Sequence, residues 1–249
     1  MAVPRNILVF GATSAIAHAI GRRYAEEGAN FVLVARNQIQ LEANAADLSV
    51  RGAAKTITLA ADLNTFAEHR DLIGRAASEL GSLDIVLIAH GTLPDQESCE
   101  KSIDEMRLAI ETNLFSVMSL ATIAASRMEE QKRGSLVVLG SVAGDRGKRS
   151  NYVYGAAKAG VAVFLDGLRA RLDPADVHIL TVKPGFVDTP MTAAFPKGAL
   201  WAKPQQIAAG IVSAVDRGSA TALYLPWFWR WIMLIIRSIP ETIFRRLKL

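Results

Sequence analysis

The sequence predicts one α/β domain in which helices cover both faces of a doubly wound parallel sheet. Three observations predict this fold. Short β-rich runs alternate with helical stretches along the chain, several of these runs are continuously apolar, as strands buried on both faces are, and 249 residues suit a single α/β domain. No internal repeat, low-complexity tract or interdomain linker interrupts the pattern.

The expected elements alternate in chain order. Strands are predicted at Asn6–Phe10, Phe31–Val34, Lys55–Leu59, Ile85–Ile88, Leu136–Leu139, His178–Val182 and Ala222–Leu225. Helices are predicted at Ser14–Glu27, Gln38–Arg51, Thr65–Leu80, Ile103–Gln131, Tyr152–Leu172 and Pro204–Arg217. We take residues 1–225 as the sheet domain and residues 226–249 as an extension of the same domain.

Ligand-binding residues are expected directly after the strands, because an open parallel sheet binds ligands beyond the carboxyl ends of its strands. The segment Gly11-Ala-Thr-Ser-Ala-Ile-Ala17 follows the first strand and opens a helix, so its backbone N–H groups and the helix dipole can face a pyrophosphate. Gly11 suits the tight turn, and Thr13 and Ser14 add hydroxyl donors. The alternative is an ordinary strand-to-helix turn capped by Ser14.

The second strand leads into Arg36, at a place where an NAD-selective site usually carries an acidic residue for the ribose hydroxyls. The Arg36 guanidinium can instead pair with a 2′-phosphate. This placement favours NADP over NAD. The alternative is a solvated arginine at the start of a helix.

Ser141, Tyr154 and Lys158 indicate chemistry most directly, because a hydroxyl, a phenol and an ammonium can converge on one carbonyl oxygen. Tyr154 and Lys158 are one helical turn apart and project from the same helix face. A neighbouring cation favours the ionised phenol, so we expect Lys158 to lower the pKa of Tyr154 and to make it a general acid or base. Tyr152 is rejected for this role because the residue four positions beyond it is Ala156. Taken alone, the pair also fits a tyrosine packed beside a solvated lysine.

The net charge of +4 belongs to the end of the chain. Of 28 basic and 24 acidic residues, five basic ones and one acidic one stand in residues 226–249, which leaves 23 of each in the rest. This distribution argues against a basic nucleic-acid groove across the fold, and no nucleic-acid partner is predicted.

Compartment and metal chemistry follow from two short features. The first apolar run, Ile7 to Phe10, is too short for a signal peptide, so we expect a cytoplasmic protein. The lone Cys99 excludes an internal disulfide and a multi-cysteine metal site, and it fits a reducing compartment. Cys99 is interpreted as a small buried or loop residue, and no metal site is predicted.

Several spaced motifs together resemble the short-chain dehydrogenase/reductase family over nearly the whole chain. They are the Gly11 loop, Ala61-Asp62-Leu63, Ala89-His-Gly91, Asn113, Ser141, Tyr154 with Lys158, and Pro184-Gly-Phe-Val-Asp-Thr189. Each motif alone also fits a cap, a turn or a helix start, but their joint occurrence in this order is highly specific. The resemblance implies a Rossmann fold, an oxidoreductase and a homo-dimer or homo-tetramer. With the Arg36 argument, it implies NADP(H) as the cofactor.

The resemblance also implies roles for single residues. The expected cofactor-binding residues are Gly11, Thr13, Ser14, Ala15, Ile16, Arg36, Asp62, Leu63, Ala89, Gly91, Tyr154, Lys158, Pro184, Gly185, Val187 and Thr189. The expected catalytic residues are Asn113, Ser141, Tyr154 and Lys158. Ser141 would position the substrate oxygen while Tyr154 passes the proton, and Lys158 would hold the nicotinamide ribose. Asn113 would hold a water that connects Lys158 to solvent.

Two departures from the family pattern stand out. Ala15 and Ala17 occupy places in the phosphate loop where the family usually has glycine, which predicts looser cofactor binding. The segment Ile88-Ala-His-Gly91 stands where the family usually has Asn-Asn-Ala-Gly. We interpret His90 as a structural or adenosine-pocket residue, with a substrate contact as the alternative.

The end of the chain, residues 226–249, has an amphipathic pattern. Three tryptophans and a run of aliphatics surround a polar stripe formed by Arg230, Arg237, Glu241, Arg245 and Lys248. The apolar run is too short to span a bilayer, and such helices commonly lie in the membrane interface, so we expect peripheral contact with the inner face of the membrane. The alternative is a contact with another subunit. Ser238 and Glu241 are spaced as a capping box around Pro240, which predicts a second helix there.

A weaker resemblance concerns the substrate. The tail and the segment Arg149-Ser-Asn-Tyr-Val-Tyr-Gly155 are similar to reductases of polyprenylphosphoryl-linked keto-pentoses, which implies a lipid-linked or otherwise hydrophobic ketone. An apolar lid over the substrate is expected from Met191, Phe195, Leu200 and Trp201, with a core-covering loop as the alternative. The leading hypothesis is an NADP(H)-dependent carbonyl reductase or alcohol dehydrogenase. The alternative is a membrane-associated dinucleotide-binding scaffold with weak or lost catalysis.

Overall fold

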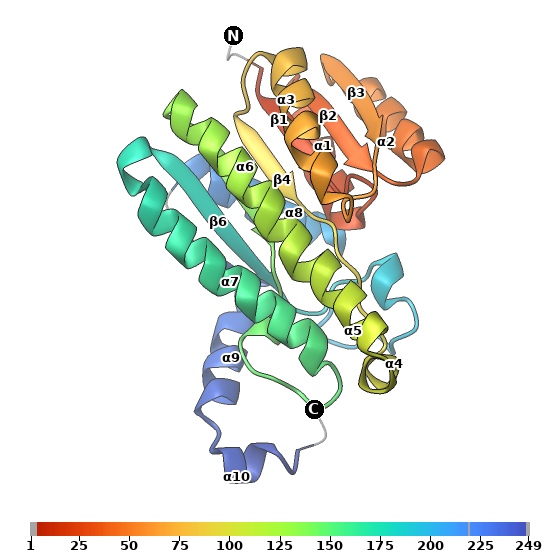
Figure 1. Ribbon diagram of the computed structural model, residues 1–249, viewed down its shortest axis with the longest axis vertical. Coiled ribbons are helices and arrows are strands. Elements are labelled where there is room, and N and C mark those ends of the chain that lie inside the picture. Colours follow the sequence, from red (N-terminus) through yellow and green to blue (C-terminus); the bar gives the residue numbers. More distant parts are fainter. Residues whose placement is uncertain (1–3, 219, 248–249) are drawn as a thin grey trace.

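One sheet of seven parallel strands forms the centre of the molecule (Figure 1). The computed structural model describes residues 4–218 and 220–247. The strand order is β3-β2-β1-β4-β5-β6-β7, and it reverses between β1 and β4, which confirms the doubly wound parallel sheet. The strands are β1 (Asn6–Phe10), β2 (Asn30–Ala35), β3 (Lys55–Ala60), β4 (Ile85–Ile88), β5 (Gly134–Leu139), β6 (Val177–Pro184) and β7 (Ala222–Leu225).

Helices connect the strands and lie on both faces of the sheet. They are α1 (Ala15–Ala25), α2 (Gln38–Val50), α3 (His69–Leu80), α4 (Gln96–Lys101), α5 (Ile103–Ile110), α6 (Ser116–Gln131), α7 (Tyr152–Leu172), α8 (Pro204–Arg217), α9 (Trp229–Ser238) and α10 (Glu241–Phe244). Short 3₁₀ turns are η1 (Phe66–Glu68), η3 (Val142–Gly144), η4 (Asp173–Ala175) and η5 (Pro190–Thr192), and η2 (Glu111–Phe115) is a π-helical turn.

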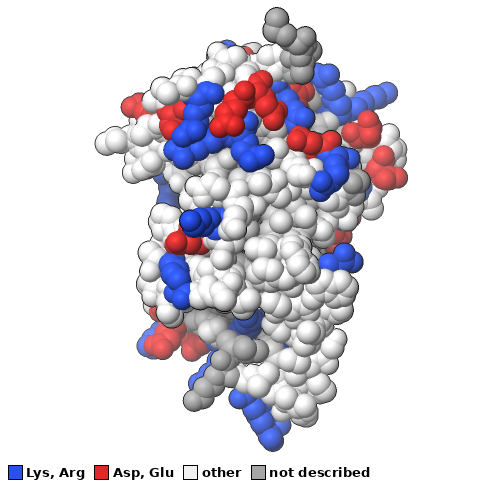
Figure 2. All heavy atoms as spheres, turned by 180° about the vertical axis from the view of Figure 1, so that it is seen from behind, with Lys and Arg blue, Asp and Glu red and all other residues white. Residues whose placement is uncertain are grey.

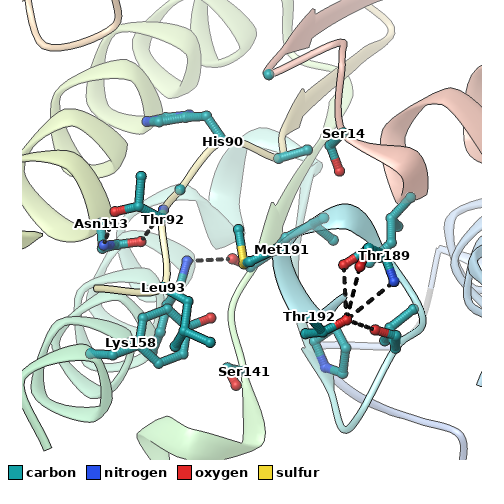
Figure 3. Close-up of a pocket in the computed structure, with 18 of the residues that line it drawn as sticks. Ser14, His90, Thr92, Leu93, Asn113, Ser141, Lys158, Thr189, Met191 and Thr192 are labelled. Atoms are coloured by element: carbon teal, nitrogen blue, oxygen red, sulfur yellow. Dashed lines mark hydrogen bonds between the residues drawn. The ribbon is translucent and has the colours of Figure 1, made fainter. Parts of the chain in front are cut away.

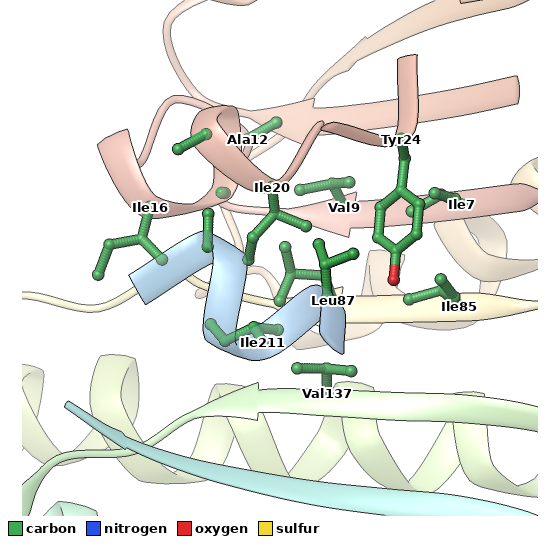
Figure 4. Packing of buried hydrophobic residues seen from close by; sticks show 14 of the residues in the cluster. Ile7, Val9, Ala12, Ile16, Ile20, Tyr24, Ile85, Leu87, Val137 and Ile211 are labelled. Carbon is green, nitrogen blue, oxygen red and sulfur yellow. The ribbon is translucent and has the colours of Figure 1, made fainter. Parts of the chain in front are cut away.

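Alternate strand residues face the two helical layers. Ile7 and Val9 of β1 pack with α1, α2 and α8, and Figure 4 shows Ile211 of α8 within this cluster. Leu8 and Phe10 of the same strand point to the other face and pack with α3, α6 and α7. Because both faces are covered, the loops at the carboxyl ends of the strands are left to form a site on a rigid base.

The predicted strands are confirmed, and no predicted strand end differs from the observed one by more than two residues. The helix predicted at Ile103–Gln131 is interrupted by η2 and so forms α5 and α6. The helix predicted at Thr65–Leu80 begins as η1, and α3 itself begins at His69. The sequence analysis missed α4, which has only six residues and therefore no clear period; the Asp95 carboxylate caps it by accepting from the Ser98 N–H.

One helical stretch, Ile103–Gln131, is long and apolar enough to cross a membrane by length and composition, within the residues that the structure describes. It corresponds to α5, η2 and α6. In α6, Val117, Leu120 and Ala121 are almost fully buried against the sheet. We therefore interpret the stretch as part of the protein core, since a buried core helix can be as long and as apolar as a helix that crosses a membrane.

The tail folds back onto the sheet domain as α9 and α10 (blue in Figure 1). Trp229 and Met233 of α9 are buried in a cluster with Val142 of η3, and Tyr224 of β7 packs against this cluster. The tail therefore contacts the loop after β5. It also contacts β7, the strand directly before the tail in the chain.

Arg146 holds the carboxyl end of α9. Its guanidinium donates to the carbonyl oxygens of Ile236 (2.5 Å) and Ile239 (2.6 Å), and it forms an ion pair with Glu241 at 3.0 Å. The ring of Phe244 lies 3.7 Å from the guanidinium carbon. A cation at this position satisfies carbonyl groups that a helix end leaves without partners.

The capping box predicted at Ser238 and Glu241 is wrong. The Ser238 hydroxyl donates to the Leu234 carbonyl oxygen within α9 (2.9 Å), and Glu241 is bound by Arg146. The second helix does begin at Glu241, but its N-cap residue is Pro240, which ends the preceding turn because it has no N–H to donate.

The outer face of α9 is apolar and exposed. Trp231, Leu234 and Ile235 of α9 and Trp227 in the turn before it are each more than half exposed, and the spacing of the three helical residues places them on one side of α9. We call these four residues the outer stripe. In Figure 2, charged side chains gather over the upper part of the molecule, whereas the lower part, where the tail lies in Figure 1, is mostly uncharged.

Candidate active site

A cavity of about 420 Å³ lies beyond the carboxyl ends of the strands (Figure 3). All the residues that the sequence predicts for catalysis or cofactor binding line it, namely Gly11, Thr13, Ser14, Ala15, Ile16, Arg36, Asp62, Leu63, Ala89, Gly91, Asn113, Ser141, Tyr154, Lys158, Pro184, Gly185, Val187 and Thr189. The fold thus brings together residues from the loops after six strands, while their individual roles stay predictions.

Ser141, Tyr154 and Lys158 form a contiguous group in this cavity. Ser141 directly follows Gly140 at the end of β5, and its hydroxyl accepts from the Ala143 N–H (3.1 Å) and is hydrogen-bonded to the Tyr154 side chain. Lys158 is buried, and its Nζ donates to the Leu139 carbonyl oxygen (3.1 Å). The Lys158 Nζ lies 5.6 Å from the centre of the Tyr154 ring, so the same-face arrangement expected from the sequence is present.

Burial decides the ionisation of this pair. It raises the pKa of Tyr154 to about 12, against a smaller lowering effect of the hydrogen bond with Ser141. It also lowers the pKa of Lys158 to about 8. The pKa of Tyr154 is therefore not moved toward neutral pH as expected, because the cost of burying a phenolate outweighs the lowering effect of the Ser141 hydrogen bond, and the effect of Lys158 on the tyrosinate stays a prediction. At neutral pH, Tyr154 therefore carries its proton and is placed to act as an acid.

Two glycines that the sequence analysis did not single out bring the serine loop against the tyrosine helix. A Cβ on Gly144 would lie 2.7 Å from the backbone nitrogen of Ala159 and 2.7 Å from the carbonyl carbon of Lys158. A Cβ on Gly155 would lie 2.9 Å from the Ala143 carbonyl oxygen. Because η3 and α7 touch through their backbones, larger residues at either position would push the hydroxyl and the phenol apart.

Asn113 lies fully buried in η2. Its Oδ1 accepts from the Thr92 N–H (3.1 Å), and its Nδ2 donates to the Thr92 hydroxyl (3.2 Å) and to the Ala109 carbonyl (2.9 Å). A Cβ on Gly91 would lie 2.7 Å from the Asn113 Oδ1 and 3.5 Å from the Lys158 Nζ. Asn113 thus fixes the loop after β4 beside Lys158, as Figure 3 shows for Asn113 and Thr92. Its role in holding a water stays a prediction.

The Gly11 loop is built for a close approach of backbone groups. Gly11 has a φ of +75°, and a Cβ there would lie 2.5 Å from the backbone nitrogen of His90, so both the turn and its contact with the loop after β4 require glycine. Ser14 is the N-cap residue of α1, but its side chain makes no capping hydrogen bond. The alternative interpretation, a turn capped by Ser14, is thus confirmed for the position of the N-cap but not for a side-chain hydrogen bond. The N–H groups at the start of α1, with no acidic residue in the first turn, suit an anion.

Arg36 and Asp62 are exposed at the rim of the cavity. Arg36 follows β2 directly, as predicted. The Asp62 carboxylate accepts from the Asn64 N–H (3.0 Å) and so shapes the turn after β3. Their places are those expected for contacts with the adenosine half of a dinucleotide.

His90 takes part in a buried polar contact. Its Nε2 lies 2.9 Å from the Ser116 hydroxyl oxygen, and that hydroxyl donates to the Leu63 carbonyl oxygen. Burial, followed by the nearby charge of Lys158, lowers the pKa of His90 to about 3, so the imidazole is neutral and its Nε2–H donates to Ser116. These contacts support the structural interpretation of His90, which also lines the cavity beside Gly11.

The loop after β6 carries the remaining predicted contacts. Val187 is buried and pairs with Ala202 in a parallel bridge, and the Thr192 hydroxyl donates to the Val187 carbonyl (2.6 Å). The same Thr192 oxygen accepts from the Thr189 N–H (3.2 Å), and Thr189 is the N-cap residue of η5. These bonds, drawn in Figure 3, fix the backbone of the segment that carries the predicted cofactor contacts Val187 and Thr189.

Aromatic side chains form one wall of the cavity. The Phe186 ring stacks on Trp201 (5.3 Å between centroids, 19° between planes) and meets Trp229 edge-on (5.3 Å, 81°). A Cβ on Gly185 would lie 1.9 Å from the Trp229 Nε1, so this glycine makes room for the tail. The sequence does not predict Trp229 as a residue of the cavity, because nothing in residues 226–249 shows which tryptophan faces inward.

Three of the four residues predicted for the lid line the cavity. They are Met191, Phe195 and Trp201. Leu200 is not among the lining residues and is 43% exposed. The segment therefore forms part of the cavity wall, and the prediction for Leu200 is wrong.

Comparison with known proteins identifies the family. Residues 5–199 match the family model described as short chain dehydrogenase. The chain belongs to the short-chain dehydrogenase/reductase family. It is therefore an oxidoreductase, and as a member of this family it binds a nicotinamide dinucleotide.

Relatives in bacteria match this short-chain dehydrogenase along almost its whole length. An uncharacterized oxidoreductase of Mycobacterium tuberculosis is 36% identical over 241 residues, which covers 97% of this chain and 96% of the relative. An uncharacterized oxidoreductase of Streptomyces coelicolor is 36% identical over 248 residues, with 98% and 96% covered. One from Staphylococcus aureus is 32% identical over 211 residues, with 84% and 90% covered.

Solved structures share the fold. A levodione reductase superposes with a TM-score of 0.83 at 24% identity, covering 90% of this chain and 97% of the other. A variant of actinorhodin polyketide ketoreductase, solved with NADPH, superposes with a TM-score of 0.82 at 22% identity, covering 92% and 98%. At these identities the likeness shows the Rossmann-type fold.

Proposed function

We propose that this short-chain dehydrogenase is an NADP(H)-dependent carbonyl reductase or alcohol dehydrogenase for a hydrophobic substrate. The observation that carries the proposal is the convergence of Ser141, Tyr154 and Lys158 in the same cavity as the Gly11 loop. The names of the two structural neighbours, a levodione reductase and a polyketide ketoreductase, support a carbonyl group as the reacting centre. The aromatic wall supports a hydrophobic substrate body.

The chain's own groups polarise the carbonyl and move the proton. The bound nicotinamide supplies or accepts the hydride. Tyr154, protonated at neutral pH, donates its proton to the substrate oxygen in the reductive direction, and the Ser141 hydroxyl donates a hydrogen bond to the same oxygen. Lys158 keeps its charge below a pH of about 8 and favours the tyrosinate as it forms.

Substitution of the acid tests the mechanism. In Tyr154→Phe the ring keeps its packing, but no proton is available at the substrate oxygen, so we expect turnover of carbonyl substrates to fall by at least about a hundred-fold. The dissociation constant of NADPH, measured by fluorescence titration, should stay within about two-fold of the wild type. Unchanged turnover in Tyr154→Phe would show that the mechanism is wrong.

Turnover and NADPH binding of the wild type also distinguish the enzyme from the alternative, a membrane-associated dinucleotide-binding scaffold. NADPH binding without oxidation of NADPH by any ketone tested would favour a dinucleotide-binding scaffold. Its support in the sequence is limited to Ala15 and Ala17 in the phosphate loop.

Preference for NADP(H) is proposed from Arg36. The residues present fit the dinucleotide, because Gly11 leaves room for a backbone approach and Ser14, Ala15 and Ile16 at the start of α1 line the cavity. An exposed guanidinium directly after β2 can then pair with a 2′-phosphate. We expect the wild type to bind NADPH at least about ten-fold more tightly than NADH, and Arg36→Asp to reverse this order. A wild-type preference for NADH, measured by titration, would refute the assignment.

Peripheral membrane contact is proposed for the outer stripe of α9. Trp227 and Trp231 are exposed beside aliphatic side chains, and Arg230 and Arg237 lie on the same helix, a composition that suits an anionic bilayer surface. A lipid-linked ketone would reach the cavity from such a surface. The homo-dimer or homo-tetramer and the cytoplasmic location stay predictions.

A further inference from the structure

Three basic side chains and one carboxylate line the cavity. They are Arg36, Lys148, Lys158 and Asp62. The proposed function uses Arg36 and Asp62 for the adenosine half of the dinucleotide and Lys158 for the nicotinamide half. It leaves the charge of Lys148 without a partner.

Lys148 lies in the segment between η3 and α7, and therefore between Ser141 and Tyr154 in the chain. It is partly buried, and within the described part of the chain its ammonium forms no ion pair or hydrogen bond. Burial alone lowers the pKa of Lys148, since no neighbouring acid offsets the loss of solvent. The fold thus places a partly desolvated cation in the wall of the cavity, on the connection between the segments that carry Ser141 and Tyr154.

Two other lysines near the cavity show the ordinary arrangement. Lys183 pairs with Asp145 at 2.6 Å, and Lys197 pairs with Asp188 at 2.6 Å. Both carboxylates are supplied by the chain itself. The described chain supplies no such carboxylate for Lys148, so an anion that pairs with this ammonium would have to belong to a ligand.

Asn151 adds a second polar group without a partner. It also lines the cavity, and its Oδ1 is buried with no hydrogen bond to any described residue. As the N-cap residue of α7 it makes no capping hydrogen bond with its side chain. A buried amide oxygen without a donor is costly, so the connection that carries Lys148 has a second polar group whose partner the described chain does not supply.

The remaining substrate wall is apolar. Met191, Phe195, Trp201 and Trp229 line the cavity together with Phe186. Apolar side chains of this kind bind the hydrocarbon or aromatic body of a ligand, and a few polar groups then fix its orientation.

We propose that Lys148 binds an anionic group of the substrate, so that the enzyme acts on a carbonyl compound with an apolar body and one carboxylate or phosphate. This inference rests on the proposed function of the cavity. The ammonium and the anion form a charge-assisted hydrogen bond in a partly buried site, which orients the carbonyl toward Tyr154.

Three aryl methyl ketones test the proposal, since they share one reacting group and differ in charge. They are 4-acetylbenzoate, 4-acetylphenyl phosphate and the neutral methyl 4-acetylbenzoate. For the wild type with NADPH, we expect at least one anionic ketone to have a KM at least ten-fold below that of the ester. Lys148→Met should raise the KM of the anionic ketone by ten-fold or more and leave that of the ester unchanged, and Lys148→Arg should restore most of the difference. The ranking of benzoate and phosphate identifies the preferred anion.

Binding is measured separately from turnover. Isothermal titration of each ketone into the enzyme saturated with NADP⁺ should show the same ten-fold dependence on Lys148. Lys101→Met, which removes an exposed lysine on α4, is the matched control and should change neither constant. The dissociation constant of NADPH should be equal in Lys148→Met and the wild type.

The outcomes separate the two proposals. If no ketone is reduced but the anionic ones bind through Lys148, the anion site stands and the proposed reaction fails. If the ester is reduced and Lys148→Met affects all three ketones equally, the reaction stands and the anion site fails. Equal affinity of the wild type for the charged and neutral ketones, or a loss of NADPH binding in Lys148→Met, would also overturn the anion site.

Discussion

Tyr154 and Lys158 show how far a residue pattern determines chemistry. Their spacing predicts the shared helix face, and the Lys158 Nζ does lie 5.6 Å from the Tyr154 ring centre. Their ionisation depends on burial, which raises the pKa of Tyr154 and lowers that of Lys158. This burial depends on the helices and loops that cover the pair. Because those elements are distant in the chain, the residues around Tyr154 and Lys158 do not predict the two pKa shifts.

The lowered pKa of Lys158 predicts a pH dependence of stability. Burial moves this pKa from 10.5 to about 8, so between these pH values the unfolded chain binds more protons than the folded one. The contribution of Lys158 to the free energy of unfolding therefore rises as pH increases from about 8 to about 10.5, by on the order of 3 kcal/mol. In Lys158→Met this rise is absent.

Urea denaturation at pH 7.5 and pH 9.8 measures the effect. We expect the stability of Lys158→Met relative to the wild type to fall between the two pH values. The range ends below pH 10 because the raised pKa of Tyr154 acts in the opposite direction between about 10 and about 12. Lys101→Met, at an exposed position, should follow the wild type. If the free energy of unfolding changed equally with pH in the wild type and in Lys158→Met, the lowered pKa of Lys158 would be contradicted.

At the scale of elements, short segments position the site and are the least predictable part of the fold. The long strands and helices have a clear apolar period, and the sequence analysis found them. The six residues of α4 and the π turn at η2 have no such period, and they depend on contacts such as those of Asn113 with Thr92. The same holds for η3, whose packing on α7 through Gly144 is a tertiary contact.

Gly144→Ala tests this contact between η3 and α7. The new Cβ would meet the α7 backbone at 2.7 Å, and a backbone moves less readily than a side chain. We expect a loss of about 1 to 3 kcal/mol in the free energy of unfolding, as for other overpacked sites. Because the serine loop is displaced, turnover should fall by at least about ten-fold.

Gly147→Ala is the matched control for this substitution. It lies in the same connection, and a Cβ there would have no atom within 4 Å. Thermal unfolding and turnover should both stay close to the wild type. If Gly144→Ala and Gly147→Ala behaved alike, the backbone contact would not position Ser141.

At the scale of the whole molecule, the tail forms part of the wall of the cavity. Its sequence predicts an amphipathic helix, and α9 has that form. The sequence does not show that Trp229 faces the cavity or that Arg146 binds the carboxyl end of the helix, because both depend on residues far away in the chain. Removing residues 226–249 would therefore damage the cavity as well as the surface.

The outer stripe is better tested by substitutions than by deletion. We expect Trp231→Ser combined with Ile235→Ser to reduce co-sedimentation with vesicles of phosphatidylglycerol and phosphatidylcholine by at least about five-fold, because both side chains are exposed and apolar. Ile103→Ser, which changes an exposed apolar residue on α5, should bind as the wild type does. NADPH binding should be equal in all three proteins.

Size-exclusion chromatography with light scattering decides between the membrane and a second subunit. A change in the number of subunits in the double variant, with vesicle binding unaltered, would show that the stripe is a contact between copies of this chain. Loss of vesicle binding at an unchanged molecular mass would support the membrane.

The position of Trp229 affects how substrates can be assigned across this family. The match to the family model ends at residue 199, whereas Trp201 and Trp229 of the aromatic wall lie beyond it. This match therefore identifies the family but contains no information about these two side chains. In comparisons among the relatives from Mycobacterium and Streptomyces, differences after residue 199 would be the first place to look for a change of substrate.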